Sequence, residues 1–350
     1  MGARQHRPRG VIGGWLAGVV ALLMMVDANA WERVRDTAPE RYSVVEGDTL
    51  WDIADRFLYA PWQWPELWQN NPDIDNPNLI YPGDVLTLKN CQGAPCLSLT
   101  QAQRVVKLSP KMRTVPRREA IPPIDPDIIQ PFLRDHRIVS GDPSEDVLAY
   151  VVAGDQGRLI SGAGDSLYAK GQVPRQGKVG IYRPADTYMA ADGSPLGTEL
   201  IKIGEARYLR AEGDIVQLQV LSAEQEVRNN DIVLALETPR YSDDLVPRAP
   251  LNELSGTLIG VPGGVRFVGR LQVVTIDLGT LDGVQAGHVF QIAQQGEVVS
   301  DPRSQASLML PSEAAGTLMV FNPYDHVSYA LVMKASRVLE VGDLVRTPAR

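Results

Sequence analysis

Hydrophobic residues between Tyr42 and Leu88 change from strand-like to helical spacing and back. Tyr42 and Val44 alternate with polar neighbours, which is typical of a half-buried strand. Val85–Leu88 repeats this alternation after a turn at Pro82-Gly83-Asp84. Between these two strands, four apolar residues fall at helical spacing: Leu50, Ile53, Ala54 and Phe57.

Two helices are therefore expected between the strands. The first begins after the Glu46-Gly47-Asp48 turn, because either Asp48 or Thr49 can cap its first turn. The second covers Trp64–Gln69, since proline is tolerated in a first helical turn. An Asn/Pro/Asp-rich loop follows at residues 70–78. The predicted order is strand, helix, helix, strand.

From about Val147 onward, the pattern consists of short β-rich runs separated by Gly-Asp and Asp-Gly turns. Strands of this length at frequent intervals predict all-β units. The expected strands are Ala149–Val152, Lys178–Tyr182, Ile215–Leu221, Ile232–Leu236, Val265–Asp277, His288–Ile292 and Tyr329–Val332. The predicted fold class is α+β, with a small N-terminal β-α-α-β module followed by a mainly β C-terminal region.

This C-terminal region also indicates an internal duplication. Gln176–Tyr182 resembles Gln285–Ile292, and Asn230–Val233 resembles Gly342–Val345. We expect two repeat units, residues 147–240 and 250–348; the alternative is chance similarity among β-rich segments. Their pattern also has a weak likeness to the β-barrel-like C-terminal modules of exported bacterial envelope proteins. Residues 100–145 contain seven prolines and predict an extended linker, although apolar residues such as Ile128 and Phe132 indicate that part of it docks on the next domain.

Residues 41–90 resemble the LysM domain, a small β-α-α-β carbohydrate-binding module of cell-wall proteins. The resemblance covers about 50 of 350 residues and rests on several motifs in matching order. These are Tyr42-x-Val44, Gly47-Asp48-Thr49-Leu50-Trp51-x-Ile53-Ala54, Asn71-Pro72, Asn78-x-Ile80-Tyr81-Pro82-Gly83 and Leu86-x-Leu88. The chain departs from the family by an insertion of aromatic and proline residues, Tyr59–Pro65, between the helices.

The resemblance implies a shallow groove that binds glycans containing N-acetylglucosamine. In the family, main-chain groups of two loops bind the acetamido group, and apolar side chains pack against the sugar. The matching positions here are Gly47, Asp48, Thr49 and Leu50 in the first loop and Asn71, Pro72, Asp73 and Ile74 in the second. The alternative is that Gly47-Asp48-Thr49 is only a turn and a helix cap.

Aromatic residues are concentrated in the same part of the chain. No tryptophan follows Trp68, and four lie between Trp51 and Trp68. Trp62 and Trp64 belong to the insertion and are candidates for contact with a sugar or a protein. Trp51 and Trp68 are better explained as core residues of a very small domain.

The first 30 residues have the order expected of a secretory signal: arginines, an apolar run from Val11 to Val26, and Ala28-Asn29-Ala30. We expect cleavage after Ala30 and no membrane span afterwards; an uncleaved anchor is the alternative. Cleavage removes three arginines and one aspartate, a net charge of +2, and so leaves −10 from a total of −8. Such an acidic chain is not expected to bind nucleic acid. One basic cluster, residues 104–118, reads as a solvated linker or as a contact for an anionic partner.

The two cysteines, Cys91 and Cys96, follow the last predicted strand of the module. Export to an oxidising compartment predicts a disulfide between them, rather than a metal site. The remaining chain has no recognisable catalytic motif, since its three histidines, His136, His288 and His326, are isolated from cysteine and from metal-binding spacing. We expect no cofactor, no metal and no catalysis.

These observations favour a periplasmic or wall-associated protein that binds peptidoglycan through residues 41–90. Its region 147–350 would then present a surface to another envelope protein. Two alternatives remain open: a cell-wall hydrolase with an unfamiliar catalytic domain, and a structural subunit of an envelope assembly.

Overall fold

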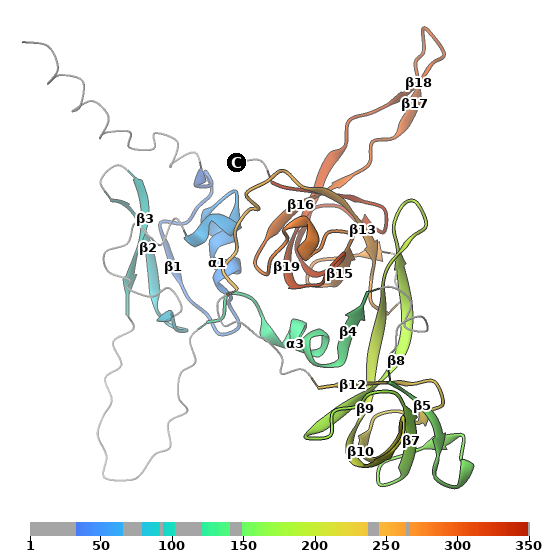
Figure 1. Cartoon of the computed structure of the whole chain (residues 1–350). Helices are drawn as coiled ribbons and strands as arrows, with labels where there is room; N and C mark the ends of the chain where they lie inside the picture. Colours follow the sequence, from blue (N-terminus) through green and yellow to red (C-terminus); the bar gives the residue numbers. More distant parts are fainter. Residues whose placement is uncertain are drawn as a thin grey trace, which may run out of the picture. The chain divides into compact units, whose positions relative to one another are not determined.

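The computed structural model describes residues 33–65, 79–91, 94–101, 121–140, 149–236, 245–263 and 267–348. It divides into two compact units, residues 1–121 and 122–350 (Figure 1). The expected signal segment, residues 1–30, and the whole basic cluster, residues 104–118, lie outside the described residues.

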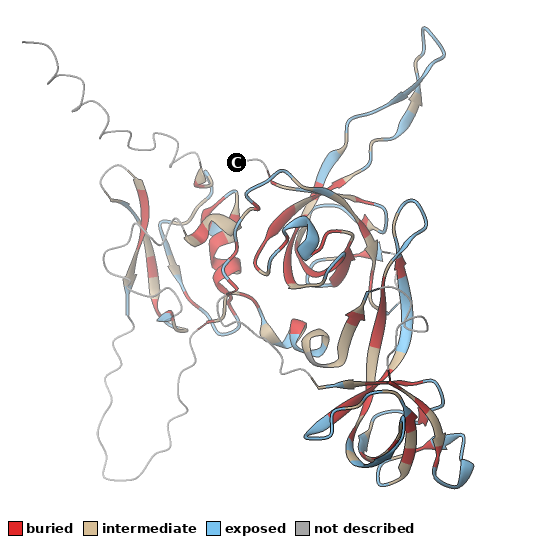
Figure 2. Cartoon of the chain, in the orientation of Figure 1, coloured by how far each residue is buried: buried red, intermediate tan, exposed pale blue. Residues whose placement is uncertain are grey.

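The first unit contains a three-stranded antiparallel sheet in the order β1-β2-β3. Helix α1 is largely buried (Figure 2). Its residues Leu50, Ile53 and Phe57 belong to the core of this unit. The elements are β1 (Arg41–Ser43), α1 (Leu50–Phe57), the 3-10 turn η2 (Pro61–Gln63), β2 (Val85–Cys91) and β3 (Ala94–Thr100).

Of the predicted order strand, helix, helix, strand, both strands and the first helix are confirmed, and Thr49 is the residue that caps α1. The predicted second helix lies partly outside the described residues; before it, Pro61–Gln63 form a single 3-10 turn. Strand β3 was not predicted. It forms a hairpin with β2, across which the expected Cys91–Cys96 disulfide is present.

The folded unit is longer than the predicted module of residues 41–90. Val34 forms a β-bridge with Leu58, and Arg35 donates to the Leu58 carbonyl at 2.7 Å and to the Asp55 carboxylate at 2.6 Å. At the other end, the Ile121 amide donates to the Ile80 carbonyl at 2.9 Å, and the Ile121 side chain is buried. Flanking segments on both sides therefore complete the core.

The second unit contains two six-stranded barrels. In the first, strand pairings run in the order β10-β7-β5-β12-β8-β9, and β10 also pairs with β9, which closes the ring. Its strands are β5 (Ala149–Gly154), β7 (Ser166–Lys170), β8 (Lys178–Met189), β9 (Pro195–Glu212), β10 (Ile215–Ala223) and β12 (Ile232–Ala235). Its core includes Leu167, Ile181 and Leu218.

The second barrel is closed in the order β13-β15-β20-β19-β16-β22. Its strands are β13 (Ser255–Gly260), β15 (Val273–Ile276), β16 (Val289–Gln294), β19 (Glu313–Pro323), β20 (Ser328–Ala335) and β22 (Leu344–Arg346). The single strand predicted over Val265–Asp277 is wrong. A turn at Gly269–Gln272 divides it, and only its end enters the barrel as β15.

Short elements complete this unit. The β17–β18 hairpin projects from the second barrel (Figure 1). The others are small ribbons and single turns between barrel strands. Their bounds are η4 (Asp155–Gly157), β6 (Ile160–Ser161), β11 (Val227–Arg228), β14 (Phe267–Val268), η5 (Thr280–Asp282), β17 (Val298–Ser300), β18 (Ser307–Met309) and β21 (Leu339–Glu340).

Strands β8 and β9 are long enough to extend beyond the first barrel. There, β9 also pairs with β4 (His136–Val139), and helix α3 (Pro126–Asp135) precedes β4. The prediction of an extended linker over residues 100–145 is therefore wrong for residues 126–139. Asp125 caps α3 and Pro126 occupies its first turn, so this proline favours the helix. Residues 102–120 and 141–148 lie outside the described residues.

A buried carboxylate joins this extension to the second barrel. Glu199 on β9 is 1 % exposed and accepts hydrogen bonds from Tyr188 at 3.3 Å and from Tyr329 on β20 at 2.7 Å. The third partner of Glu199 is His136 on β4, which belongs to the extension as Tyr188 does; its Nδ1 lies 2.9 Å from Glu199 Oε1. Burial raises the pKa of Glu199, but the hydrogen bonds from these three side chains outweigh it and hold the pKa below its usual value.

Replacing both cysteines, Cys91→Ser with Cys96→Ser, is expected to destabilise the first unit by ~2 kcal/mol, because the loop that they close is short. Thermal unfolding followed by tryptophan fluorescence measures this unit alone, since every tryptophan precedes residue 69. Reductant should lower the melting temperature of the parent chain and leave that of the variant unchanged. Equal melting temperatures with and without reductant in the parent would contradict the prediction.

Glu199→Gln is expected to lower the free energy of unfolding of the second unit by about 2–4 kcal/mol at pH 7. A carboxylate with a lowered pKa stabilises the fold above its unfolded value of about 4.3, and this contribution is lost as the pH falls through the folded value. The difference between parent and variant should therefore shrink on acidification below about pH 4. Urea denaturation followed by hydrogen exchange in β9 and β20 measures it, with exposed Glu224→Gln as the control. A difference that is independent of pH would contradict the assignment.

Candidate functional site

The first turn of the site is held by the Asp48 carboxylate. Asp48 Oδ2 accepts the Val45 amide at 2.8 Å and the Tyr42 hydroxyl at 2.9 Å. The Asp48 amide in turn donates to the Val45 carbonyl at 3.2 Å. Gly47 lies between them with φ of +90°, a conformation that side chains with a Cβ rarely adopt. The sequence Val45-Glu46-Gly47-Asp48 thus specifies one turn conformation.

A second turn of the same construction lies beside the first. Asp84 Oδ2 accepts the Tyr81 amide at 3.0 Å, and Gly83 has φ of +93°. Two main-chain bonds join the turns: the Val44 amide donates to the Asp84 carbonyl at 2.8 Å, and the Gly83 amide donates to the Val44 carbonyl at 2.7 Å. The sequence predicted this second turn but did not assign it to the site.

Most side chains predicted for the first loop point inward. Asp48 and Thr49 are each 8 % exposed and Leu50 is 1 % exposed. The Thr49 hydroxyl accepts the Asp52 amide at 3.1 Å and donates to the Asp52 carboxylate at 2.7 Å, which caps α1. Only Gly47 of the four predicted residues is exposed, together with its neighbours Val45 and Glu46. A ligand at this turn would therefore meet main chain and the Val45 and Glu46 side chains, rather than the side chains of residues 48–50.

The second predicted loop, Asn71, Pro72, Asp73 and Ile74, lies outside the described residues. Of the two tryptophans in the insertion, Trp64 is 3 % exposed and belongs to the core of the unit, so its ring is not available to a ligand. Trp62 is partly exposed and stays a candidate. Trp51 is buried, as the core interpretation requires.

Two charged groups beside the first turn, Arg56 and the Asp48 carboxylate, are engaged in contacts within the unit. The Arg56 guanidinium lies 4.6 Å from the centre of the Tyr42 ring, on the residue that donates to Asp48. Burial and the hydrogen bond to Asp48 raise the pKa of the Tyr42 hydroxyl, which keeps it a neutral donor at physiological pH. The turn therefore presents main-chain groups together with the Val45 and Glu46 side chains. The main-chain groups and Val45 suit the acetamido and hydroxyl groups of a ligand.

Residues 42–89 match the LysM domain family. The chain contains a LysM domain. Such a domain is a binding module for glycans of the peptidoglycan or chitin type, and LysM domains are typically extracellular or wall-associated. The match ends within β2, so β3, the disulfide and both barrels lie outside it. No curated protein matches the chain.

The described residues also bear on membrane spanning and metal binding. No described helix combines the length and the apolar character needed to span a membrane. Likewise, no group of three or more histidine, cysteine, aspartate or glutamate side chains in that part of the chain is arranged to hold a metal ion.

Gly47→Val is expected to destabilise the LysM unit by about 1–3 kcal/mol, because a β-branched residue resists a positive φ. No heavy atom lies within 4 Å of a Cβ built at this position, so the cost is conformational rather than steric. Gly47→Asn should cost less, since asparagine adopts this conformation more readily. Urea denaturation followed by tryptophan fluorescence measures both variants. An equal loss for valine and asparagine would contradict the role assigned to the turn.

Proposed function

We propose that this chain is a non-catalytic, periplasmic peptidoglycan-binding protein. It recognises N-acetylglucosamine-containing strands through the LysM domain and offers its β-barrels to other envelope components. The observation that carries the proposal is the pair of adjacent Gly-Asp turns, within a LysM domain, each of which exposes main chain at its glycine. The secretory pattern of residues 1–30 supports export.

Weak binding by a single module fits this role. Each polar contact to a glycan contributes about 0.5–1.5 kcal/mol net, and the site offers few of them. Firm attachment to the wall then depends on several copies or on a linked partner, because joined sites raise the effective concentration. The barrels are the part of the chain large enough to supply that link.

The two barrels are proposed to be copies of one unit. When the six strands of each barrel are numbered by their position in the sequence, these numbers follow one another around the two barrels in the same circular order. The Asp231 turn before β12 has its counterpart in the Asp343 turn before β22, each with the carboxylate bonded to the amide three residues earlier. These likenesses support the duplication that the repeated sequence motifs predict.

Co-sedimentation of residues 31–350 with purified peptidoglycan tests the function. Asn71→Ala should weaken binding about 2- to 10-fold, as expected for the loss of one or two glycan contacts, with little change in melting temperature. Exposed Asn229→Ala, in the other unit, is the matched control and should bind normally. Absence of sedimentation by the parent chain, while an authentic LysM protein sediments, would overturn the proposal.

A zymogram on peptidoglycan separates this role from the hydrolase alternative. The intact chain should produce no zone of lysis at any pH tested between 5 and 8. Lysis by the parent chain would instead assign the barrels a catalytic function.

A further inference from the structure

The extension of β8 has a strand edge without a partner. β12 pairs with β8 only from Val179 to Tyr182, whereas β9 pairs with β8 as far as Met189. Beyond Tyr182, no strand among the described residues pairs with this edge of β8. Pro184 has no N–H, and a bulge follows it, so the first part of the edge is protected against pairing. Thr187–Met189 remain able to accept another strand.

A similar edge exists on β13 of the second barrel. β22 pairs with β13 through Thr257, and two main-chain bonds at Leu258 extend this contact. On that side Ile259 and Gly260 have no strand partner in the described part of the chain, although Gly260 still pairs with β15 on the other side.

These two segments form the walls of one hollow of about 610 Å³. One wall consists of residues 186–191 and the other of residues 257–261, with Asp277, Val341 and Gly342 completing the lining. Each wall contains a strand segment, and the volume of the hollow lies in the range of ligand sites. Met189 and Val341 expose 47 % and 41 % of their surface there, which provides apolar contact area.

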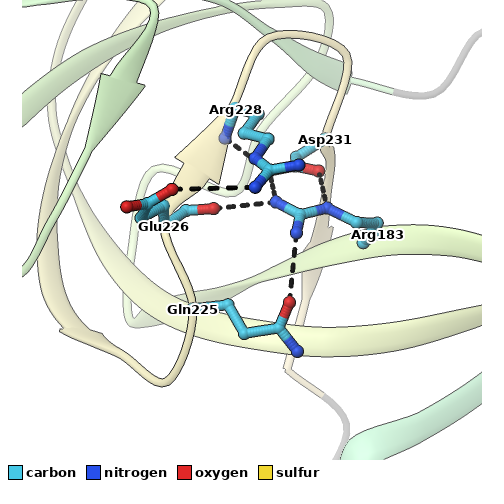
Figure 3. A network of polar contacts seen from close by, with 5 residues as sticks. All are labelled: Arg183, Gln225, Glu226, Arg228 and Asp231. Carbon is cyan, nitrogen blue, oxygen red and sulfur yellow. Dashed lines mark hydrogen bonds and ion pairs between the residues drawn. The ribbon is translucent and has the colours of Figure 1, made fainter.

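The walls are held in place by polar contacts that are buried at Tyr188 and partly buried at Arg183. Where β8 leaves the first barrel, Arg183 donates from Nε and Nη2 to the two carboxylate oxygens of Asp231, each at 3.0 Å, and from Nη1 to Gln225 at 3.1 Å (Figure 3). Further along, Tyr188 donates to Glu199, and its ring contacts β13 so closely that a Cβ on Gly260 would lie 2.5 Å from it. The hollow is therefore largely pre-formed, which reduces the entropic cost of binding.

The lining carries negative charge only. Asp186 and Asp277 are its charged residues, and no lysine, arginine or histidine contributes to it. Asp186 is exposed, while Asp277 accepts the Thr257 amide. Burial raises the pKa of Asp277 despite that bond, so a cation that approached it would favour its ionised form.

We propose that this hollow binds an extended peptide segment of a partner protein, in which a lysine or arginine lies among apolar residues. The segment adds as a strand along Thr187–Met189, its apolar side chains contact Met189 and Val341, and its cation faces Asp186 and Asp277. Strand addition of this kind draws affinity from main-chain bonds and specificity from the side chains. The inference rests on the proposed role of the barrels as the partner-binding part of the chain.

The test uses residues 31–350 and a fluorescent, acetylated six-residue peptide of alternating threonine and valine with one central lysine. Anisotropy should reveal saturable binding, and a peptide with glutamate in place of the lysine should bind at least about tenfold more weakly. Asp186→Lys should reverse this preference. Glu224→Lys, which makes the same charge change at an exposed site outside the hollow, should leave it unchanged.

Hydrogen exchange provides the second readout. The lysine peptide should slow exchange at residues 187–189, and a version with N-methylated valines, which cannot pair as a strand, should not bind. The proposal is overturned by any of four results: no saturable binding at millimolar peptide, equal binding by Asp186→Lys and the parent, protection elsewhere only, or concentration-dependent protection of residues 186–191 without peptide. The last of these would assign the hollow to a second copy of the chain. No glycan is present, so failure here leaves the peptidoglycan proposal intact.

Discussion

One side-chain interaction fixes the conformation of five turns in the two units. An aspartate accepts the amide three residues before it, and the residue just before the aspartate has a positive φ. The pattern occurs at Asp48, Asp84, Asp165, Asp231 and Asp343, with distances of 2.6–3.0 Å. Glycine takes the positive φ in four cases, and Asn230, at +72°, takes it in the fifth. Because α1, β2, β7, β12 and β22 each begin after such a turn, the turns fix where those elements start and, for strands, which face enters the core.

The same local character explains which features the sequence could predict. Gly47-Asp48 and Gly83-Asp84 are contiguous signals, and so are the cap at Thr49 and the spacing of the cysteines. Helix α3 was also marked, by Asp125-Pro126 followed by Ile128, Ile129 and Phe132 at helical spacing. The prediction weighed the number of prolines and missed that Pro126 stands where a first turn tolerates it. Strand β3 was missed for a related reason, because a disulfide of this short spacing already implies a hairpin between its cysteines.

Features that depend on contacts distant in the sequence had no such signal. Glu199 meets His136 across 63 residues and Tyr329 across 130, and no local pattern distinguishes it from other glutamates. Closing a barrel likewise pairs β13 with β22, from opposite ends of the domain. Trp64 illustrates the converse problem: a tryptophan in an insertion reads as exposed, yet the small core of the LysM unit has room for it and buries it. Burial of this kind is decided by packing, which composition does not specify.

Both proposed binding surfaces have main chain at their centre, supported by polar side chains that are buried or half-buried. At the LysM turn, the carboxylate of Asp48 binds Val45 and Tyr42, and the backbone around Gly47 stays exposed together with the Val45 and Glu46 side chains. Along β8, Arg183 and Glu199 make contacts that hold the strand, and the main-chain edge at Thr187–Met189 is left for a ligand. The side chains that make each surface possible therefore do not lie on it. Sequence reasoning could find the LysM loop because a rigid turn needs a contiguous motif, whereas a free strand edge is defined by the partner strand that stops short of it.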